Sequence, residues 1–436
     1  MHFQELQIRA KLKKKVLGWA VVEKARRRQN ARATNLKEGD ANTKYFHLRA
    51  NGRRRKNFIQ RLRIGHGWAI SHQDKQESIF AHFSTMMAQP PNRLKDLNWE
   101  DLHFPSVNLD TLDAPFTEVE ILNVIKQLPS DKAPGPDGFT AKFFRSCWPI
   151  IKNDVIAAVN SFYNNRCADL NLLNKATMIL IPKKEGANTI QDFRPISLIH
   201  AVAKIITKIL ALRLAPFMNA LISQCQSSFI KGRSIHDNFM YVCNLARRFH
   251  KNKTSALLMK LDISKAFDSV RWDYLLTLLQ KSGFPPHWRD WIASILTTST
   301  SRVLLNGIPL DHIQHGRGLR QGDPLSPLLF VLAIDPLPRL LSRATDLALL
   351  SKLRGRTARF RTSLYADDAA IFIKPDRMDI SNLTLLLHNF HQTRQNGYPD
   401  CRKLVINWSE YQYGSHSEIQ DQTFFFNSQQ SGYPKL

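Results

Sequence analysis

Two adjacent carboxylates, Asp367 and Asp368, lie between apolar segments late in the chain. They follow Tyr365 and precede the apolar residues 369–373, and the pattern around them predicts a tight β-hairpin over 363–374. Neighbouring carboxylates repel each other and are costly to bury unless cations share them. Mg²⁺ takes oxygen ligands and commonly binds one or two protein carboxylates together with substrate phosphates. The pair therefore predicts a divalent metal site, with an exposed Asp-Asp turn as the alternative.

A third carboxylate, Asp262, ends the apolar residues 256–263, which we expect to form a buried strand. Packing gives no reason for a carboxylate there. Asp262 and Asp367 are predicted to bridge two metal ions about 4 Å apart, one activating an attacking hydroxyl and one stabilising a leaving pyrophosphate. A helix N-cap is the alternative for Asp262, and we expect Asp268 to be a cap or a salt-bridge partner.

The charge of the chain points to a polyanionic partner. Among 436 residues, 62 Lys and Arg stand against 36 Asp and Glu, a formal net charge of +26. Residues 1–70 hold 19 of these bases and 4 of the acids, a net +15. Nucleic acid is the first candidate, and the run Arg53, Arg54, Arg55 and Lys56 is predicted to contact phosphates. A solvated helix face with a charged turn is the alternative.

Several classes of protein are excluded by composition and motif. Hydrophobic residues make up 43% of the chain, so it is not wholly disordered. It has no apolar run long enough to cross a bilayer and no secretory signal at residues 1–20, which predicts a soluble, intracellular protein without a membrane partner. The five cysteines are never spaced as Cys-x-x-Cys, and the signatures of serine hydrolases, P-loop ATPases and zinc proteases are absent.

The predicted elements alternate irregularly between helix and strand. Helical patterns cover residues 4–28, 118–128, 143–163, 201–214 and 272–279, and strand patterns cover 177–182 and 256–263. A Pro- and Gly-rich loop occupies 133–138, and the chain turns polar and irregular after residue 390. Because the strands are not arranged in regular βαβ units, we predict an α+β fold with a small antiparallel sheet backed by helices.

The order of these segments resembles the reverse transcriptase of non-LTR (LINE-type) retrotransposons, particularly the plant kind, over about residues 36–390. The strongest matches are Lys-Ala-Pro-Gly-Pro-Asp-Gly at 132–138, Asp-Phe-Arg-Pro-Ile-Ser-Leu at 192–198 and Tyr-Ala-Asp-Asp at 365–368. Further matches lie at 36–40, 42–47, 181–184, 226–229, 232–238, 260–268 and 318–327.

The resemblance implies a right-hand polymerase fold, with fingers and a palm. It divides the chain into a basic helical N-terminal extension and connector (1–115), a fingers and palm domain (116–390) and an irregular C-terminal remnant (391–436). Residues 404–407 resemble the family's next segment, but Glu410 stands where that segment has a lysine. We therefore expect the thumb to be truncated or absent, and we expect no endonuclease domain, no RNase H segment and no C-terminal Cys/His cluster.

The resemblance assigns Asp262, Asp367 and Asp368 as the catalytic, metal-binding aspartates of the palm. They would hold two Mg²⁺ ions, with Mn²⁺ as a substitute. Phe267 takes the position of the aromatic steric gate, whose ring would stack under the deoxyribose and exclude a 2′-hydroxyl. Without the resemblance, Phe267 would be a core residue.

Four further residues are assigned to the nucleotide by the resemblance. Arg194 and Lys183 match residues that grip the incoming triphosphate, and the planar guanidinium of arginine suits bidentate phosphate contact. Gln321 and Gly322 match the loop that lies against nucleotide and template, where a missing Cβ permits close backbone approach. The alternatives are a surface arginine after a turn and an ordinary Gly-Asp-Pro turn.

The predicted function is that of an RNA-directed DNA polymerase, which adds dNTPs to a DNA primer on an RNA template, with nuclear work implied by the family alone. The first alternative is a catalytically inactive, truncated relic that only binds nucleic acid. An RNA-templated RNA polymerase would also use paired aspartates, but Phe267 at the sugar gate argues against it.

Overall fold

The computed structural model describes residues 3–31, 44–93, 95–130, 132–164, 169–263, 265–353, 360–394 and 404–407. The side chain of Asp262, Glu410 and the rest of the predicted C-terminal remnant apart from 391–394 and 404–407 lie outside this description. The α-helices are α1 (Phe3–Ala31), α2 (Lys44–Asn57), α3 (His72–Met87), α4 (Glu118–Gln127), α5 (Ala141–Ser146), α6 (Trp148–Tyr163), α7 (Leu170–Leu173), α8 (Ala201–Leu214), α9 (Met218–Leu221), α10 (Ile235–Lys251), α11 (Trp272–Lys281), α12 (Pro286–Thr297), α13 (Ser326–Ile334), α14 (Pro336–Asp346) and α15 (Arg377–Arg394). The strands are β1 (Leu62–Ile64), β2 (Gly67–Ala69), β3 (Lys175–Pro182), β4 (Phe193–Ile199), β5 (Leu257–Asp262), β6 (Thr300–Leu305), β7 (Ile308–Gln314), β8 (Thr362–Tyr365), β9 (Asp368–Ile373) and β10 (Leu404–Asn407).

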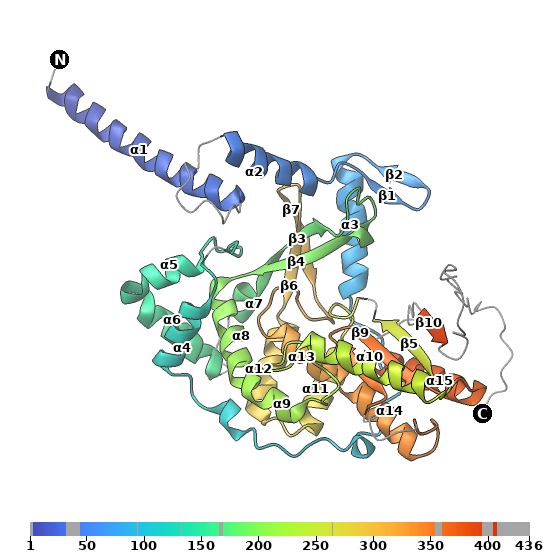
Figure 1. Ribbon diagram of the computed structural model, residues 1–436. Coiled ribbons are helices and arrows are strands. Elements are labelled where there is room, and N and C mark those ends of the chain that lie inside the picture. The colour runs from blue at the N-terminus through green and yellow to red at the C-terminus, as the bar shows by residue number, and fades with distance from the viewer. Residues whose placement is uncertain are drawn as a thin grey trace.

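Two small four-stranded sheets organise the molecule (Figure 1). The aspartate sheet has the strand order β10-β5-β9-β8, and each neighbouring pair is antiparallel. The second sheet, here the β3 sheet, has the order β4-β3-β6-β7, with β3 and β6 parallel and the other pairs antiparallel. Helices pack around both sheets, so the predicted α+β class with small sheets is confirmed.

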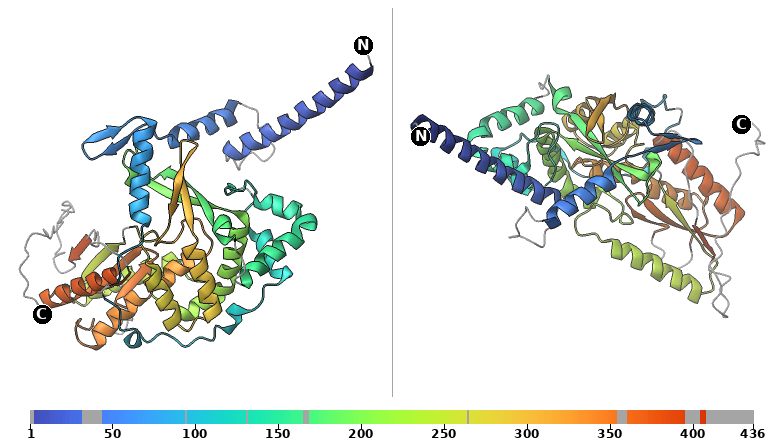
Figure 2. Two further views of the ribbon diagram at one scale, coloured as in Figure 1. Left: turned by 180° about the vertical axis from the view of Figure 1, so that it is seen from behind. Right: turned by 90° about the horizontal axis from the view of Figure 1, so that it is seen from above.

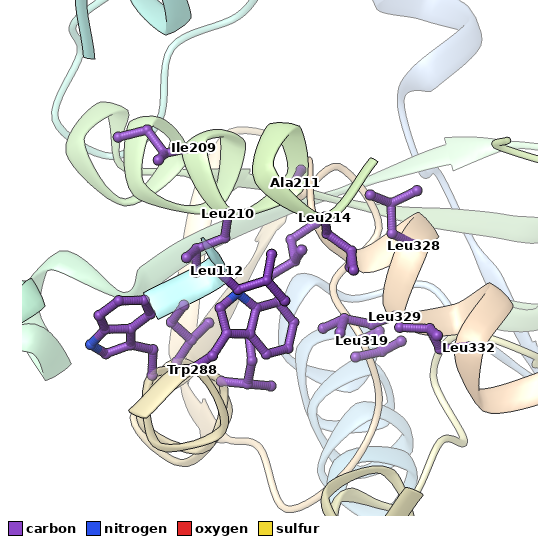
Figure 3. Close-up of a cluster of buried hydrophobic side chains, with 14 of the residues drawn as sticks. Leu112, Ile209, Leu210, Ala211, Leu214, Trp288, Leu319, Leu328, Leu329 and Leu332 are labelled. Atoms are coloured by element: carbon purple, nitrogen blue, oxygen red, sulfur yellow. The ribbon is translucent and has the colours of Figure 1, made fainter. Parts of the chain in front are cut away.

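The largest apolar core lies among the helices and anchors both sheets. Trp288 of α12 is fully buried, and Leu210 and Leu214 of α8 point toward it and toward Leu329 of α13 (Figure 3). Leu319 belongs to the same core. This residue comes just before Gln321, so the loop that carries a predicted nucleotide residue is anchored in the core.

The basic N-terminal segment differs in packing along its length. Helix α1 extends away from the rest of the molecule (Figures 1 and 2), and its residues 7–23 are exposed. After α2, however, Ile59, Leu62 and Phe83 are buried against Met178 and Val303 of the β3 sheet. Packing therefore crosses the predicted boundary at residue 115, and the division of the chain into domains stays a prediction. No helix in the described ranges is long and apolar enough to cross a membrane.

Local sequence patterns agree closely with several of these elements. The predicted helix 201–214 is α8, and the predicted strand 256–263 differs from β5 by one residue at each end. The predicted helix 143–163 is interrupted at Cys147, which separates α5 from α6. Pro149 explains the break, because proline is tolerated in the first turn of a helix but removes a hydrogen bond in its interior.

The loop at 133–138 is clamped onto the junction between β4 and α8. A Cβ atom on Gly135 would lie 2.1 Å from the carbonyl oxygen of Ile199, so only glycine fits there. The Asp137 carboxylate accepts a hydrogen bond of 2.6 Å from the Ala201 amide, one of the unpaired donors at the start of α8. The contact fixes the end of β4, the strand that carries Arg194.

We expect Asp137→Ala to lower the free energy of unfolding by about 1 kcal/mol, because helix α8 loses a side-chain acceptor at its N-terminus. Urea unfolding followed by circular dichroism measures the change. Asp154→Ala, at an exposed position on α6, serves as the control and should leave the unfolding midpoint unchanged. Equal midpoints for the two variants would contradict a capping role for Asp137.

Candidate functional site

The register of β5 and β9 brings the predicted aspartates together. Asp262 is paired with Asp368 at the end of this antiparallel ladder, and Tyr365 of β8 is paired with Asp368 from the other side. Just beyond β5, the Ile263 amide donates a hydrogen bond of 3.3 Å to the carbonyl oxygen of Asp367. Three carboxylate-bearing residues from two distant segments therefore meet at one end of the aspartate sheet.

The turn that carries Asp367 is strained and is held from behind. Ala366 has a φ of 54°, in the left-handed region that residues other than glycine rarely adopt. Its amide donates a hydrogen bond of 3.2 Å to the Oε1 atom of the fully buried Gln226, and the Ser227 amide donates one of 3.2 Å to the carbonyl oxygen of Leu364. Such a conformation costs about 1–3 kcal/mol and persists only where its surroundings determine it.

The charges around this turn fit a hard cation. The Asp368 carboxylate is 56% exposed, and the Lys260 ammonium lies 3.3 Å from it. An ammonium already neutralises one of the paired carboxylates, so a positive charge is stabilised at this position. Among the side chains that the structure describes, which do not include that of Asp262, no three His, Cys, Asp or Glu gather as metal ligands. Two adjacent carboxylates with solvent access nevertheless match the oxygen ligands that Mg²⁺ prefers.

Phe267 lies in a turn between β5 and α11 and is partly buried. Its ring stacks on that of Phe330, with the ring centroids 4.4 Å apart and the planes 18° from parallel. The carbonyl oxygen of Phe267 accepts a hydrogen bond of 2.8 Å from the Leu319 amide. The ring is thus seated on the apolar core and is fixed in orientation, as a residue that gauges the shape of a ligand must be.

Gly322 meets the close approach that was predicted for it, but the approaching group belongs to the protein. Its φ is 111°, and a Cβ atom would lie 2.7 Å from the carbonyl oxygen of Ser197. The Ser197 amide donates a hydrogen bond of 2.8 Å to the carbonyl oxygen of Gln321. The loop at 321–322 is therefore docked onto β4, and any larger residue at position 322 would push it away from that strand.

Asp268 is a site residue whose role sequence reasoning missed. The predicted cap or salt bridge is replaced by a hydrogen bond, because the Gln321 amide donates to both carboxylate oxygens at 3.4 and 3.3 Å. Burial raises the pKa of Asp268 to about 6, while the Gln321 hydrogen bond and the charges of Lys265 and Lys183 act to lower it. Asp268, Gln321 and Lys183 are thus gathered in one region. Neither local pattern nor spacing pointed to this contact.

The two predicted triphosphate residues lie on the β3 sheet. In the backbone register, Arg194 of β4 is paired with Ile181 of β3. Its side chain is exposed and has no hydrogen-bond or salt-bridge partner in the described part of the chain. Lys183 directly follows β3, and its Nζ atom donates a hydrogen bond of 2.8 Å to the carbonyl oxygen of Gln191. Arg194 is therefore available to an anionic ligand, whereas Lys183 would have to exchange its present contact.

The predicted basic cluster lies at the C-terminal end of α2. Arg54, Arg55 and Lys56 are exposed, whereas Arg53 is half-buried. Cations in the last turn of a helix are favoured by the helix dipole, so the cluster also stabilises α2. Its exposed members form a compact positive surface beside the β3 sheet.

An α+β fold that presents paired aspartates on a β-hairpin, next to an aspartate from an adjacent strand, has the features of a nucleotidyltransferase palm. A sequence profile of the family described as Reverse transcriptase (RNA-dependent DNA polymerase) matches residues 181–396, which contain all eight predicted catalytic and nucleotide residues. Residues 181–396 therefore form a reverse transcriptase domain, which is related to the polymerases of non-LTR retrotransposons.

Curated relatives support this assignment. The chain is 29% identical over 340 residues to the Transposon TX1 uncharacterized 149 kDa protein of Xenopus laevis, covering 78% of this chain and 25% of that protein. It is 30% identical over 241 residues to the Retrovirus-related Pol polyprotein from type-2 retrotransposable element R2DM of Drosophila melanogaster, covering 55% and 22%. It is 25% identical over 288 residues to the RNA-directed DNA polymerase from mobile element jockey of Drosophila melanogaster, covering 62% and 30%. The chain thus spans less than a third of each of these proteins.

We expect the stability of the protein to fall as pH rises from about 4 to about 6 because of Asp268. Its carboxyl group stays protonated in the fold up to about pH 6, whereas in the unfolded chain it ionises near its ordinary pKa of 3.8. Between these values the unfolded state binds fewer protons, so rising pH favours unfolding. Urea unfolding across this range, compared with Asp268→Asn, measures the contribution.

The Asp268→Asn variant should lack this part of the pH dependence, and Asp376→Asn, at an exposed position, should keep it. Parallel stability profiles for the wild type and Asp268→Asn would show that Asp268 ionises normally in the fold.

Proposed function

We propose that this chain is the RNA-directed DNA polymerase of a non-LTR retrotransposon and adds dNTPs to the 3′ end of a DNA primer on an RNA template. The observation that carries the proposal is the pairing of Asp262 with Asp368 beside Asp367, inside the segment that matches the reverse transcriptase family. Membership of this family implies a divalent metal, a template, a primer and dNTP substrates. The plant-type ancestry and the truncated thumb remain predictions.

In this proposal Asp262, Asp367 and Asp368 hold two Mg²⁺ ions, for which Mn²⁺ can substitute. The bound ions would activate the primer hydroxyl and stabilise the charge that develops on the transferred phosphate. Lys260 would give up its contact with Asp368 when a divalent cation binds, because the more highly charged ion interacts more strongly with the carboxylate.

The remaining residues position the nucleotide. Arg194, exposed on β4, would bind the triphosphate with the paired donors of its guanidinium. Lys183 would add a second positive charge near Asp268. Gln321, held on β4 through Ser197, would lie against the base, and the Phe267 ring would exclude a 2′-hydroxyl. Together these contacts orient the substrate, which supplies a large part of the catalysis in phosphoryl transfer.

We expect Mg²⁺-dependent incorporation of dTTP on poly(rA)/oligo(dT) to fall by at least about 10²-fold in each of Asp262→Asn, Asp367→Asn and Asp368→Asn, because each removes a negative charge that holds the metal. The variants keep the size of the side chain, so the fold should persist. Radiolabelled dTTP incorporation measures the effect.

The control is Asp376→Asn. Asp376 lies just after β9 and is exposed, so this variant should retain wild-type incorporation. Full activity in any of the three site variants would refute the metal assignment for that residue. A folded wild-type chain that binds RNA but incorporates no dTTP would instead support the inactive relic.

We expect the triple substitution Arg54→Ser, Arg55→Ser and Lys56→Ser to weaken binding of single-stranded RNA and to reduce the steepness of log K against log[salt] by about 2. The variant would lose three phosphate contacts, so fewer counterions would be released on binding. Fluorescence anisotropy across a salt series measures the slope. Point substitutions are preferable to deletion of residues 1–70, since Ile59 and Leu62 belong to the core beside the β3 sheet.

Three exposed bases elsewhere serve as the matched control, substituted by serine at Lys126, Lys281 and Arg377. Both triple variants lose the same charge, so only a local role for the α2 cluster makes their slopes differ. Identical slopes would remove the α2 cluster from the RNA interface.

A further inference from the structure

Arg394 is a buried cation at the C-terminal end of α15. Its side chain is 2% exposed, although arginine is rarely buried. The Nη2 atom donates a hydrogen bond of 2.9 Å to the carbonyl oxygen of Ala266, the residue just before Phe267. The centre of the guanidinium also lies 5.4 Å from the ring centroid of Phe330, within the range of a cation–π contact.

These two contacts meet at the predicted sugar gate. Phe330 is fully buried and supports the Phe267 ring through a stack of 4.4 Å. Arg394 therefore touches the ring on which Phe267 rests and the peptide group from which Phe267 extends. A cation that is removed from water makes strong contacts with both an aromatic ring and a carbonyl oxygen.

The backbone of Arg394 completes a clamp on the same turn. Its carbonyl oxygen accepts a hydrogen bond of 3.1 Å from the Arg271 amide, at the start of α11. On the other side of the turn, the amides of Gly318 and Leu319 donate hydrogen bonds of 2.8 Å to the carbonyl oxygens of Val270 and Phe267. The turn that carries Phe267 is thus held by the end of α15 and by the loop that leads to Gln321.

We propose that Arg394 is a positioning residue of the nucleotide site. It fixes the position of the Phe267 ring and thereby determines the discrimination between deoxyribose and ribose. The inference deepens the proposed polymerase function and rests on it. Arg394 itself need not touch the substrate. It acts by fixing the Ala266 carbonyl and the Phe330 ring, so that Phe267 cannot sink away from an added 2′-hydroxyl.

The electrostatic environment supports a role beyond packing. Burial lowers the pKa of Arg394 to about 10, and the negative charge of Asp367 acts in the opposite direction. The guanidinium remains protonated at neutral pH, so the fold keeps a desolvated cation at this place. A methionine of similar length would fill the space without that cost, which favours a function for the guanidinium contacts.

The test uses the full chain bound to poly(rA) and an oligo(dT) primer that ends in a dideoxynucleotide, so that no chemistry occurs. The affinities for dTTP and UTP are measured from the nucleotide concentration that half-stabilises the complex of enzyme, template-primer and nucleotide. The measurement is made in Mg²⁺ and in Ca²⁺. We expect the ratio of the two affinities to fall about 10-fold in Arg394→Met, because the Ala266 carbonyl loses a charged donor. Arg394→Lys keeps the charge but not the planar contacts, and should show a smaller fall.

Arg361→Met is the matched control. Arg361 is also a buried arginine that donates to main-chain carbonyls, those of Phe372 and Ser351, next to the edge strand β8 of the aspartate sheet. Its loss should lower stability and leave the dTTP to UTP ratio unchanged. If Arg394→Met fails to fold, Phe330→Leu removes the seat of the Phe267 ring while Arg394 remains, and the same fall in the ratio is expected.

The outcomes separate the two proposals. A wild type that prefers dTTP, together with Arg394→Lys and Phe330→Leu variants that keep the full preference, would overturn the role of Arg394 and leave the polymerase proposal intact. A folded wild type that binds template and primer but neither nucleotide would overturn the polymerase proposal itself, and the inference with it.

Discussion

The pairing of β5 with β9 is the constraint on which the site depends. It places Asp262 opposite Asp368, although the two residues are far apart in the sequence. Side chains alternate between the faces of a strand, so a shift of one residue would turn every side chain of β9 to the other face. Buried Leu261 and Met259 on β5, and Ile371 on β9, oppose such a shift, because it would move apolar side chains into water. The apolar pattern of the strands thereby sets the position of the carboxylates.

The supports around the site are hydrogen bonds to main-chain groups, made by segments that are distant in sequence. Gln226 holds the turn at Ala366, Leu319 holds the carbonyl of Phe267, and Ser197 holds that of Gln321. Each contact fixes backbone position more sharply than apolar packing does, since hydrogen bonds are directional. The core among the helices supplies rigidity, and these contacts supply the geometry.

The sequence predicted the elements that apolar periodicity sets, and it did not predict the hydrogen bonds between distant segments. The strand ending in Asp262 and helix α8 are set by apolar periodicity within a few residues, and both were predictable. The docking of Gly322 on Ser197 and the contact between Gln321 and Asp268 join segments that share no local pattern, so they could not be predicted. Two further features were available but missed: the break at Pro149, and the pair Asn306-Gly307, which is a strong hairpin signal and turns β6 into β7.

The same hairpin connects the basic segment to the nucleotide residues. At its tip, Asn306 donates a hydrogen bond of 3.0 Å to the carbonyl oxygen of Ile59 and accepts one of 2.9 Å from its amide. Ile59 lies two residues after the end of α2, and the strands of the hairpin belong to the sheet that carries Arg194. A phosphate backbone bound at Lys56 would therefore be held in a defined position relative to Arg194. The basic end of α2 is in this way tied to the sheet, which would lower the entropic cost of aligning a bound strand with the aspartates.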